Sequence, residues 1–379
     1  MGFLFTLKYK LGLFPTYDKI SKEWNQILDK KRTLDKLQNS EIVSEYLQLK
    51  EQYGNITVSN GVNPEETNIL NELAKLEKNK KVKKFLSQNT ENIDSQPFEV
   101  IHYMELKATL DNIKVTAPKE EAESDVNKSR YMELASTNEV KQFEALKADS
   151  SLDYFNSNAL LLDESFFENK SMGERWSLEP QFSDFSGGSY SQADDLHLYQ
   201  ASNVKPNEKS CDIAVLRESK QGKAWSATLG FIPKTFAYTS GMMHSKKSVS
   251  AEKLSVEVAA KFKPQEGVVN ALVLKDRRNG KMIDLFRTGT KGVGFGTFDA
   301  STSNHSSLKS IDFGRKHVFR IDIQDNEIVW FLNNQEVSRQ AGAFRGAEWD
   351  IAALVAVKKE NVQPSNMTLD WIRVVDQLV

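Results

Sequence analysis

Hydrophobic positions follow two different periods along the chain, and the period changes near residue 150. In the first part, apolar residues recur at three- and four-residue steps, as at Trp24 and Leu28, which places them along one face of a helix. In the second part, apolar and polar residues alternate, as over 254–262, a pattern typical of a half-buried β-strand. The chain of 379 residues is long enough for more than one domain. We therefore predict a multidomain α and β protein, with a helical region over 1–150 and a β-rich domain over 151–379.

A short motif repeats within the helical region. Each copy has an aromatic residue three positions before a leucine, so both side chains lie on one helix face. The copies occupy residues 46–50, 103–107, 131–134 and 143–147. Such short helices bury that face only by stacking on neighbours or on a partner. Two interpretations stay open: the aromatic residues pack a helical bundle, or the α-helical repeats form an arm that docks onto a larger assembly.

The β-rich domain consists of many short segments with turn signals between them. Two alternating segments, 318–323 and 327–332, flank the polar residues Gln324, Asp325 and Asn326 and predict a β-hairpin. The last alternating segment begins at Met367 and continues close to the end of the chain. Many short strands with few helices indicate a β-sandwich.

Five segments of the β-rich domain, taken in order, resemble the family 16 glycoside hydrolases. They are 163–167 with Trp176, 238–245, 253–263, 317–337 and 367–374. That family has the concanavalin A-like lectin/glucanase fold, so the resemblance implies a β-sandwich of the jelly-roll type with a sugar-binding cleft. It also implies that Trp176, Trp330 and Trp371 are core residues.

The segment 281–287 corresponds in this resemblance to the family's catalytic strand, which reads E-x-D-x-x-E or E-x-D-x-E. Met282 stands at the first Glu position, and Asp284 retains the central Asp. Arg287 stands at the last Glu position, or Phe286 if the shorter spacing applies. Retaining hydrolysis needs two carboxyl groups about 5–5.5 Å apart, and only Asp284 can ionise as an acid here. We therefore predict a non-catalytic pseudo-glycosidase, with no catalytic residue at these degenerate positions.

The pseudo-glycosidase is expected to be a carbohydrate- or protein-binding structural module of a larger assembly, such as a virion or a cell-surface complex. Two alternatives remain open. Relocated catalysts, with Glu257 or Asp299 as candidates, would make the protein a divergent glycoside hydrolase acting on β-glucan or galactan polysaccharides. A purely structural protein, whose sandwich has no ligand, is the other alternative.

Four residues are candidates for ligand binding. Asp284 and Arg287 either form an ion pair that plugs a disused cleft or hydrogen-bond a sugar or an acidic ligand in a retained groove. Trp225 and Trp349 lie outside clean strand patterns. Each of these two tryptophans is therefore either a core residue or an exposed ring that stacks on a sugar.

Composition narrows the classes of site and partner. The net charge of −2 gives no bulk attraction to nucleic acid. The single cysteine, Cys211, rules out an intramolecular disulfide, and the five histidines show no metal-ligand spacing. We therefore predict no metal and no cofactor, although the resemblance permits a structural calcium at Asp370. The predicted partners are a glycan, a protein docked on the helical region, or both, and an oligomer or a larger assembly is compatible with these patterns.

Targeting signals are sparse in the sequence. No apolar run is as long as a membrane-spanning helix, which needs about 18 residues. The apolar stretch at the N-terminus is interrupted by Lys8 and Lys10 and has no small-residue cleavage site, so it does not match a secretory signal. The predicted location is the cytoplasm or an assembly, a virion included.

Overall fold

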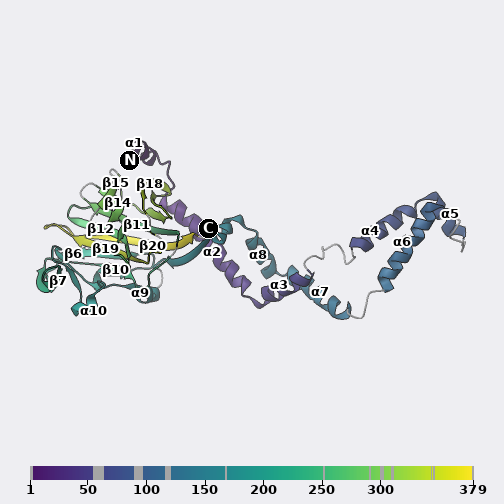
Figure 1. The fold of residues 1–379 in the computed structure, drawn as a ribbon, viewed down its shortest axis with the longest axis horizontal. Coiled ribbons are helices and arrows are strands. Elements are labelled where there is room, and N and C mark those ends of the chain that lie inside the picture. The colour runs from purple at the N-terminus through teal and green to yellow at the C-terminus, as the bar shows by residue number, and fades with distance from the viewer. Residues whose placement is uncertain are drawn as a thin grey trace. The chain divides into compact units, whose positions relative to one another are not determined.

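The computed structural model describes the chain except for residues 1–2, 54–63, 89–96, 116–120, 167–168, 251, 290–291, 299–302, 309–310, 343, 345 and 378–379. The chain forms two compact units: a sandwich unit, Met1–Leu28 with Ser150–Val379, and a helical unit, Asp29–Asp149. The predicted fold class, α-helices followed by a concanavalin A-like β-sandwich, is confirmed (Figure 1). The first 28 residues belong to the sandwich unit, whereas the sequence pattern had suggested one helical region over 1–150.

Two large sheets face each other in the sandwich unit. The ten-stranded sheet follows the path β18 (Gln335–Ala341), β17 (Glu327–Leu332), β16 (His317–Ile323), β11 (Leu254–Phe262), β20 (Ser365–Gln377), β6 (Cys211–Leu216), β9 (Tyr238–Ser240) and β4 (His197–Tyr199), with β1 (Asn158–Glu164) beside β20 and β5 (Val204–Pro206) beside β6. The seven-stranded sheet follows the path β15 (Ser303–Leu308), β14 (Gly292–Phe298), β13 (Met282–Gly289), β12 (Val268–Asp276), β19 (Trp349–Val357), β10 (Met242–Ser245) and β2 (Trp176–Ser177). These paths refer to the described residues.

Smaller elements complete the sandwich unit. A three-stranded sheet consists of β3 (Tyr190–Gln192), β7 (Lys220–Ser226) and β8 (Gly230–Phe236), in that order. The short helices are η1 (Ser150–Asn156), α9 (Asn169–Arg175), α10 (Ser183–Ser186) and η2 (Ala201–Asn203). The hairpin β7–β8 and helix α10 flank one face of the seven-stranded sheet, where the candidate site lies.

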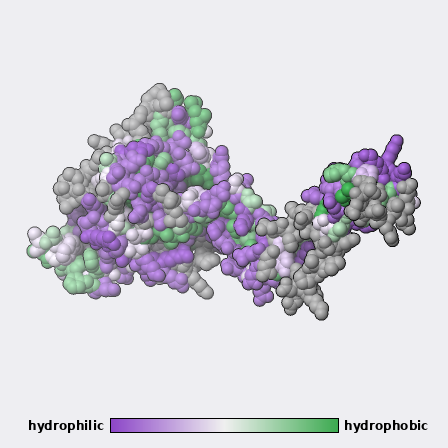
Figure 2. Space-filling view, turned by 45° about the vertical axis from the view of Figure 1, so that its right-hand side comes forward, coloured by the Kyte–Doolittle hydropathy of each residue, from purple (hydrophilic) through white to green (hydrophobic). Residues whose placement is uncertain are grey.

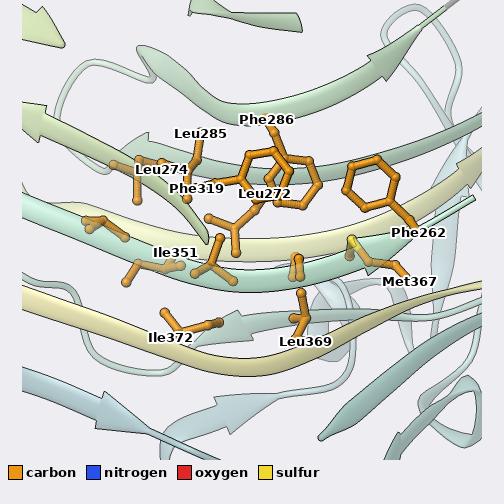
Figure 3. Close-up of a cluster of buried hydrophobic side chains, with 14 of the residues drawn as sticks. Phe262, Leu272, Leu274, Leu285, Phe286, Phe319, Ile351, Met367, Leu369 and Ile372 are labelled. Atoms are coloured by element: carbon orange, nitrogen blue, oxygen red, sulfur yellow. The ribbon is translucent and has the colours of Figure 1, made fainter. Parts of the chain in front are cut away.

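The hydrophobic core of this unit lies between the two large sheets. Leu254 and Val256 of β11 belong to it and have no exposed surface. Three phenylalanines from different strands meet there, with the ring of Phe286 5.0 Å from that of Phe262 and 4.6 Å from that of Phe319. Figure 3 shows these side chains pointing toward one another between the strands. Because burying a side chain of this size stabilises a fold by about 1.5–3 kcal/mol, this layer holds the sheets together.

Two further sequence predictions are confirmed in this unit. The segments on either side of 324–326 form the hairpin β16–β17, in which Ile323 pairs with Ile328. The three tryptophans assigned to packing are buried: Trp176 is 2% exposed, Trp330 is 0% exposed and Trp371 is 4% exposed.

Helices α1 (Phe3–Lys10) and α2 (Tyr17–Gln38) begin in the sandwich unit, and the start of α2 packs on the ten-stranded sheet. Ile20 packs against Trp371 in a small apolar cluster. The Tyr17 hydroxyl donates to Asp370 at 2.5 Å, and the Trp371 indole donates to Ser21 at 3.2 Å. Because these contacts tie the segment 17–28 to β20, that segment is part of the sandwich unit although its period is helical.

Asp370, which the resemblance permitted as a calcium ligand, is held by protein groups. Its carboxylate accepts from Tyr17 and pairs with Lys316 at 2.6 Å. No group of three or more His, Cys, Asp or Glu side chains that could hold a metal ion occurs among the described residues.

The helical unit has two apolar clusters. The first joins α3 (Glu41–Tyr53), α7 (Glu121–Ser136) and α8 (Asn138–Lys147) around Tyr46, Tyr131 and Phe143. The rings of Tyr46 and Tyr131 stack with centroids 5.5 Å apart, and the Thr137 side chain caps α8 by accepting from the backbone of Val140. The aromatic residues of these motif copies therefore pack within the chain.

The second cluster joins α4 (Pro64–Leu76), α5 (Lys80–Gln88) and α6 (Phe98–Val115). Val82 and Val100 have no exposed surface, and Tyr103 is 4% exposed beside them. Tyr103, from the motif copy 103–107, is again a packing residue. None of the helices in the described part of the chain is long and apolar enough to cross a membrane.

Candidate functional site

Strand β13 carries the three positions of the degenerate catalytic motif, and a β-bulge decides which of its residues share a face. The pairing of β13 with both neighbouring strands shifts in register, between Asp284 and Arg287 on the β14 side. An extra residue at a bulge turns the following side chain to the other face. As a result Leu285 and Phe286 both enter the core, whereas Met282, Asp284 and Arg287 lie on the opposite face. Arg287, rather than Phe286, therefore occupies the third motif position.

Asp284 and Arg287 form a bidentate ion pair. The Arg287 Nε donates to Asp284 Oδ2 at 2.6 Å, and Nη2 donates to Oδ1 at 2.9 Å. The Asp284 side chain has no exposed surface, whereas that of Arg287 is 32% exposed. The Trp330 indole donates to the backbone carbonyl of Asp284 at 2.8 Å, which ties β13 to the opposite sheet. The one acid at the motif positions is thus buried with its counter-ion.

The face of the seven-stranded sheet that carries Met282 forms the floor of a cavity of about 530 Å³. One row of this floor is Met282, Lys275 and Asp350, which pair across β13, β12 and β19. The other floor residues are Met242, His244, Val273, Ala352 and Leu354. The wall is mainly aromatic and contains Phe182, Phe185, Tyr190, Tyr199, Trp225 and Phe231, together with Pro180, Gln181, Ser191 and Gln192. We call this cavity the aromatic pocket.

The aromatic wall is held together through Phe231 of β8. The Phe231 ring lies 5.0 Å from those of Tyr190 and Trp225 and 6.3 Å from that of Phe185. Phe185 is 85% exposed, Phe182 is 55% exposed and Trp225 is 39% exposed. A hydrophobic patch is visible at the lower left of Figure 2, on the side where Figure 1 places β7 and α10. Exposed apolar surface of this kind is typical of a binding site.

The sandwich is similar in fold to β-glucanases of known structure. The laminarinase catalytic domain of Thermotoga maritima is 19% identical, with a TM-score of 0.48 over 59% of this chain and 100% of that chain. The endo-β-1,3-glucanase of Pyrococcus furiosus is 19% identical, with a TM-score of 0.46 over 58% and 94%. A non-specific endo-β-1,3(4)-glucanase from glycoside hydrolase family 16 is 15% identical, with a TM-score of 0.46 over 58% and 92%. At such low identity the likeness concerns the fold alone. No protein-family model and no curated protein matches the sequence.

The four predicted ligand-binding residues are only partly brought together. Trp225 lines the aromatic pocket. Asp284 and Arg287 lie on the same sheet face as the floor residue Met282, next to the cavity rather than in its described lining. Trp349 is 1% exposed, packs in the sandwich core and lies 5.8 Å from the Phe344 ring. Its indole cannot stack on a ligand from that position, so Trp349 is a core residue and not a ligand-binding one.

Phe182 and Phe185 were missed by the sequence analysis. Phe182 lies just before the short helix α10 and Phe185 lies within it, in a segment where no strand or helix period marks them. Their signal was the presence of two large aromatic residues in a polar, loop-like segment. Whether these two side chains are exposed depends on the position of the neighbouring hairpin β7–β8, which the local sequence does not give.

The polar groups of the aromatic pocket differ in their hydrogen-bond and ion-pair partners. Both oxygens of Asp350 lie within 2.7 and 2.9 Å of Arg277 Nε. Lys275 Nζ donates to Gln181 Oε1 at 3.1 Å. His244 contacts the neighbouring backbone carbonyl of Ser245 through Nδ1, while its Nε2 has no hydrogen-bond partner among the described residues. Lys275 can therefore offer a donor to a ligand, whereas the carboxylate of Asp350 is already occupied.

One residue of the aromatic wall, Tyr199, belongs to a buried pair of rings. His197 and Tyr199 of β4 have ring centroids 4.5 Å apart. Burial lowers the pKa of His197 to about 4 and raises the pKa of Tyr199. His197 Nδ1 accepts from the backbone N–H of Val357 at 3.1 Å, so the neutral ring is the form that fits. These residues support the wall and titrate outside the range of a neutral-pH acid or base.

Glu257, a candidate for relocated catalysis, is not at this site. Glu257 lies on β11 of the ten-stranded sheet, 3.6 Å from Arg320, and its backbone pairs with Arg320 and Arg373 on the flanking strands. Burial raises the pKa of Glu257. Since the aromatic pocket is on the other sheet, Glu257 cannot serve it. Asp299 lies outside the described residues.

Proposed function

We propose that the sandwich unit binds a glycan in the aromatic pocket and does not hydrolyse it. The observation that carries this proposal is the state of the motif face of β13. Met282 has no ionisable group, and the Asp284 carboxylate is fully buried against Arg287. A retaining mechanism needs a nucleophile and a separate acid/base, and loss of the acid/base alone lowers a rate by about 10²–10⁴. Neither role has a free carboxyl group on this face.

The shape and chemistry of the aromatic pocket support sugar binding. Its volume of about 530 Å³ lies within the range of small-ligand sites, about 300–1,000 Å³. Trp225 and Phe185 present partly exposed rings, and aromatic faces provide apolar area for the C–H face of a sugar ring. Lys275 provides a polar group that can fix the sugar's orientation. Arg287, at the edge of the same face, is proposed as a further donor to the ligand, held in place by Asp284.

The helical unit is proposed to dock the protein onto a larger assembly, such as a virion or a cell-surface complex. Supporting this, some large apolar side chains of the helical unit do not join its two clusters: Phe98 is 77% exposed and Val126 is 68% exposed. The motif aromatics are already used for packing, so a partner would contact this second set of residues.

A glycan-array screen of the full chain tests the binding proposal, with release of reducing sugar followed on every hit. We expect glycan binding without release. Trp225→Ala should weaken binding about ten-fold, since a lost aromatic contact of about 0.5–1.5 kcal/mol adds to the lost apolar area. The Asp284→Ala/Arg287→Ala variant should also bind more weakly. Leu229→Ala is the matched control, because Leu229 is 71% exposed at the tip of the β7–β8 hairpin and is not in the described lining of the pocket.

Two results would overturn the proposal. Absence of binding to any glycan would leave a purely structural or protein-docking role. Release of reducing sugar from a β-glucan or galactan would establish the alternative, a divergent hydrolase. In that case the loss of release in Asp350→Asn would identify the pocket carboxylate as a participant, despite its contact with Arg277.

A further inference from the structure

We propose that the aromatic pocket selects glycans that carry an anionic substituent, a carboxylate or a sulfate, and that Lys275 binds this group. The inference rests on the proposed glycan binding and names the class of glycan. It comes from the charges on the pocket floor rather than from the aromatic wall. The strand register, the ion pairs and the loss of the motif acid each support it.

The position of Lys275 is set by strand pairing. It lies on β12, directly between Met282 of β13 and Asp350 of β19. Leu274 and Leu272, which precede Lys275 on β12 by one and three positions, are buried in the core. Because side chains alternate along a strand, Lys275 points to the other face. All three residues of this row line the cavity. The ammonium group is therefore presented to the pocket beside the first position of the degenerate motif.

The carboxylates on this face already have arginine partners. Asp350 lies within 2.7 and 2.9 Å of Arg277 Nε, and Asp284 is paired with Arg287. For Lys275 the hydrogen bond found in the structure is to the neutral side-chain amide of Gln181. No ion pair of Lys275 occurs among the described residues, and an ammonium group has three N–H donors. The floor of the pocket thus carries a cation whose charge is not matched by a carboxylate.

Position 282, which faces Lys275, adds no negative charge to the pocket floor. In an E-x-D-x-x-E strand the first position is a carboxylate, and the β12–β13 register places it directly opposite position 275. Opposite charges at directly facing positions on neighbouring strands attract each other. With Met282 there instead, Lys275 has a thioether as its neighbour on that side. A sulfate or carboxylate on a bound sugar can take the place of the missing carboxylate and form a charge-assisted hydrogen bond with Nζ.

Matched oligosaccharide pairs test this inference on the full chain. One pair is a sulfated galactan oligosaccharide and its desulfated form, and the other is a uronic acid oligosaccharide and its methyl ester. By isothermal titration calorimetry at low salt, the wild type should bind the charged member of at least one pair about ten-fold more tightly, as expected for a hydrogen bond to a charged group. The preference should shrink as salt is added. Which pair shows it distinguishes a sulfate from a carboxylate.

Three variants identify the residue responsible. Lys275→Gln should lose the preference for the charged member and keep the affinity for the neutral one. Met282→Glu should also lose it, because the new carboxylate neutralises Lys275 from inside the protein. Lys263→Gln, on an exposed lysine at the end of β11, is the control and should keep the preference.

The outcomes separate this inference from the proposed function. Equal affinity of the wild type for both members of each pair overturns the anionic preference while glycan binding stands. A preference that survives in both Lys275→Gln and Met282→Glu also overturns it, since the cation then lies elsewhere. If none of the oligosaccharides binds and the array is also empty, the proposed function and this inference both fail. Retained tryptophan fluorescence in each variant shows that the sandwich is still folded.

Discussion

Arg287 donates to both carboxylate oxygens of Asp284, at 2.6 and 2.9 Å. It lies three positions after Asp284 on β13, where a regular strand would place its side chain on the opposite face. The bulge between them makes this contact, because it turns Phe286 into the core and Arg287 out of it. As a result, the acid at the motif positions of β13 is already paired: the buried carboxylate of Asp284 accepts from the guanidinium of Arg287, which is itself partly exposed.

Replacing Arg287 and replacing Asp284 should lower the free energy of unfolding by different amounts. Arg287→Met leaves a buried carboxylate without its counter-ion, and we expect a loss of about 3–5 kcal/mol in the free energy of unfolding. Asp284→Asn should cost less, because the Arg287 side chain is 32% exposed and can turn to water. Urea unfolding followed by tryptophan fluorescence measures both, since all six tryptophans lie in the sandwich unit. Equal losses in the two variants would show that Asp284 is less isolated from water than its burial implies.

Truncation of Trp349 should mainly reduce stability, whereas truncation of Trp225 should mainly reduce glycan affinity. Trp349→Ala removes a fully packed ring from the core, where the expected loss is about 3–5 kcal/mol of unfolding free energy. Trp225→Ala removes a ring that is 39% exposed, so stability should change much less while glycan affinity falls. Urea unfolding and the array measurements, made on both variants, give the comparison. A Trp225 variant as destabilised as the Trp349 variant would assign Trp225 to packing.

The helical unit should unfold without altering the pocket. Tyr131 is 9% exposed and stacks on Tyr46, so Tyr131→Ala should destabilise that unit by about 3 kcal/mol, by analogy with other buried aromatic truncations. The loss should appear in thermal unfolding followed by circular dichroism at the helix band. The fluorescence transition of the sandwich unit and the glycan affinity should stay unchanged. A shift in the fluorescence transition would contradict independent unfolding of the helical unit and the sandwich unit.

His197 should make the sandwich unit less stable as the pH falls below neutrality. Burial lowers its pKa to about 4 in the folded protein, against about 6.5 in an unfolded chain. Between these values the unfolded state binds more protons, so the stability falls with pH, by about 2 kcal/mol from pH 7 to pH 5. His197→Asn keeps an acceptor for the Val357 N–H and removes the titration.

Comparing the wild type with His197→Asn isolates the contribution of His197 to the pH dependence of stability. Burial raises the pKa of Glu257, which acts in the opposite direction: its penalty is largest at neutral pH and decreases on acidification. Glu257 is present in both proteins, so the difference between wild type and His197→Asn in urea unfolding at pH 7 and pH 5 reports on His197. Identical pH dependence of the two proteins would contradict the prediction, because it would mean that the pKa of His197 is the same in the folded and unfolded states.

Part of the fold and of the site could be predicted from local pattern. Alternation identified the strands, and the turn at 324–326 identified the hairpin β16–β17. The order of short motifs indicated the sandwich, and the segment 281–287 indicated a motif with one acid left. These features depend on neighbours in sequence, and the spacing of side chains along a strand or a helix is fixed by backbone geometry.

The rest depends on residues that are distant in sequence. Helical periodicity shows that 17–28 forms a helix, but only the contacts with Trp371 and Asp370 place it on β20. The sequence around Trp225 and around Trp349 does not distinguish an exposed tryptophan from a core one. One lies on a hairpin beside the aromatic pocket and the other in the sandwich core, because burial is set by what packs against a strand and not by the strand itself.

The sequence by itself determined the change from helical to β structure, the type of sandwich and the absence of a second acid in the β13 motif. The tertiary structure alone decided that Arg287 and not Phe286 shares the face of Asp284, that Phe182 and Phe185 join Trp225 in one wall, and that Lys275 stands opposite Met282. The physical reason is that a one-residue shift in strand register exchanges the two faces of a sheet. Register and bulges are set by the packing of the whole sandwich, which no local stretch of sequence contains.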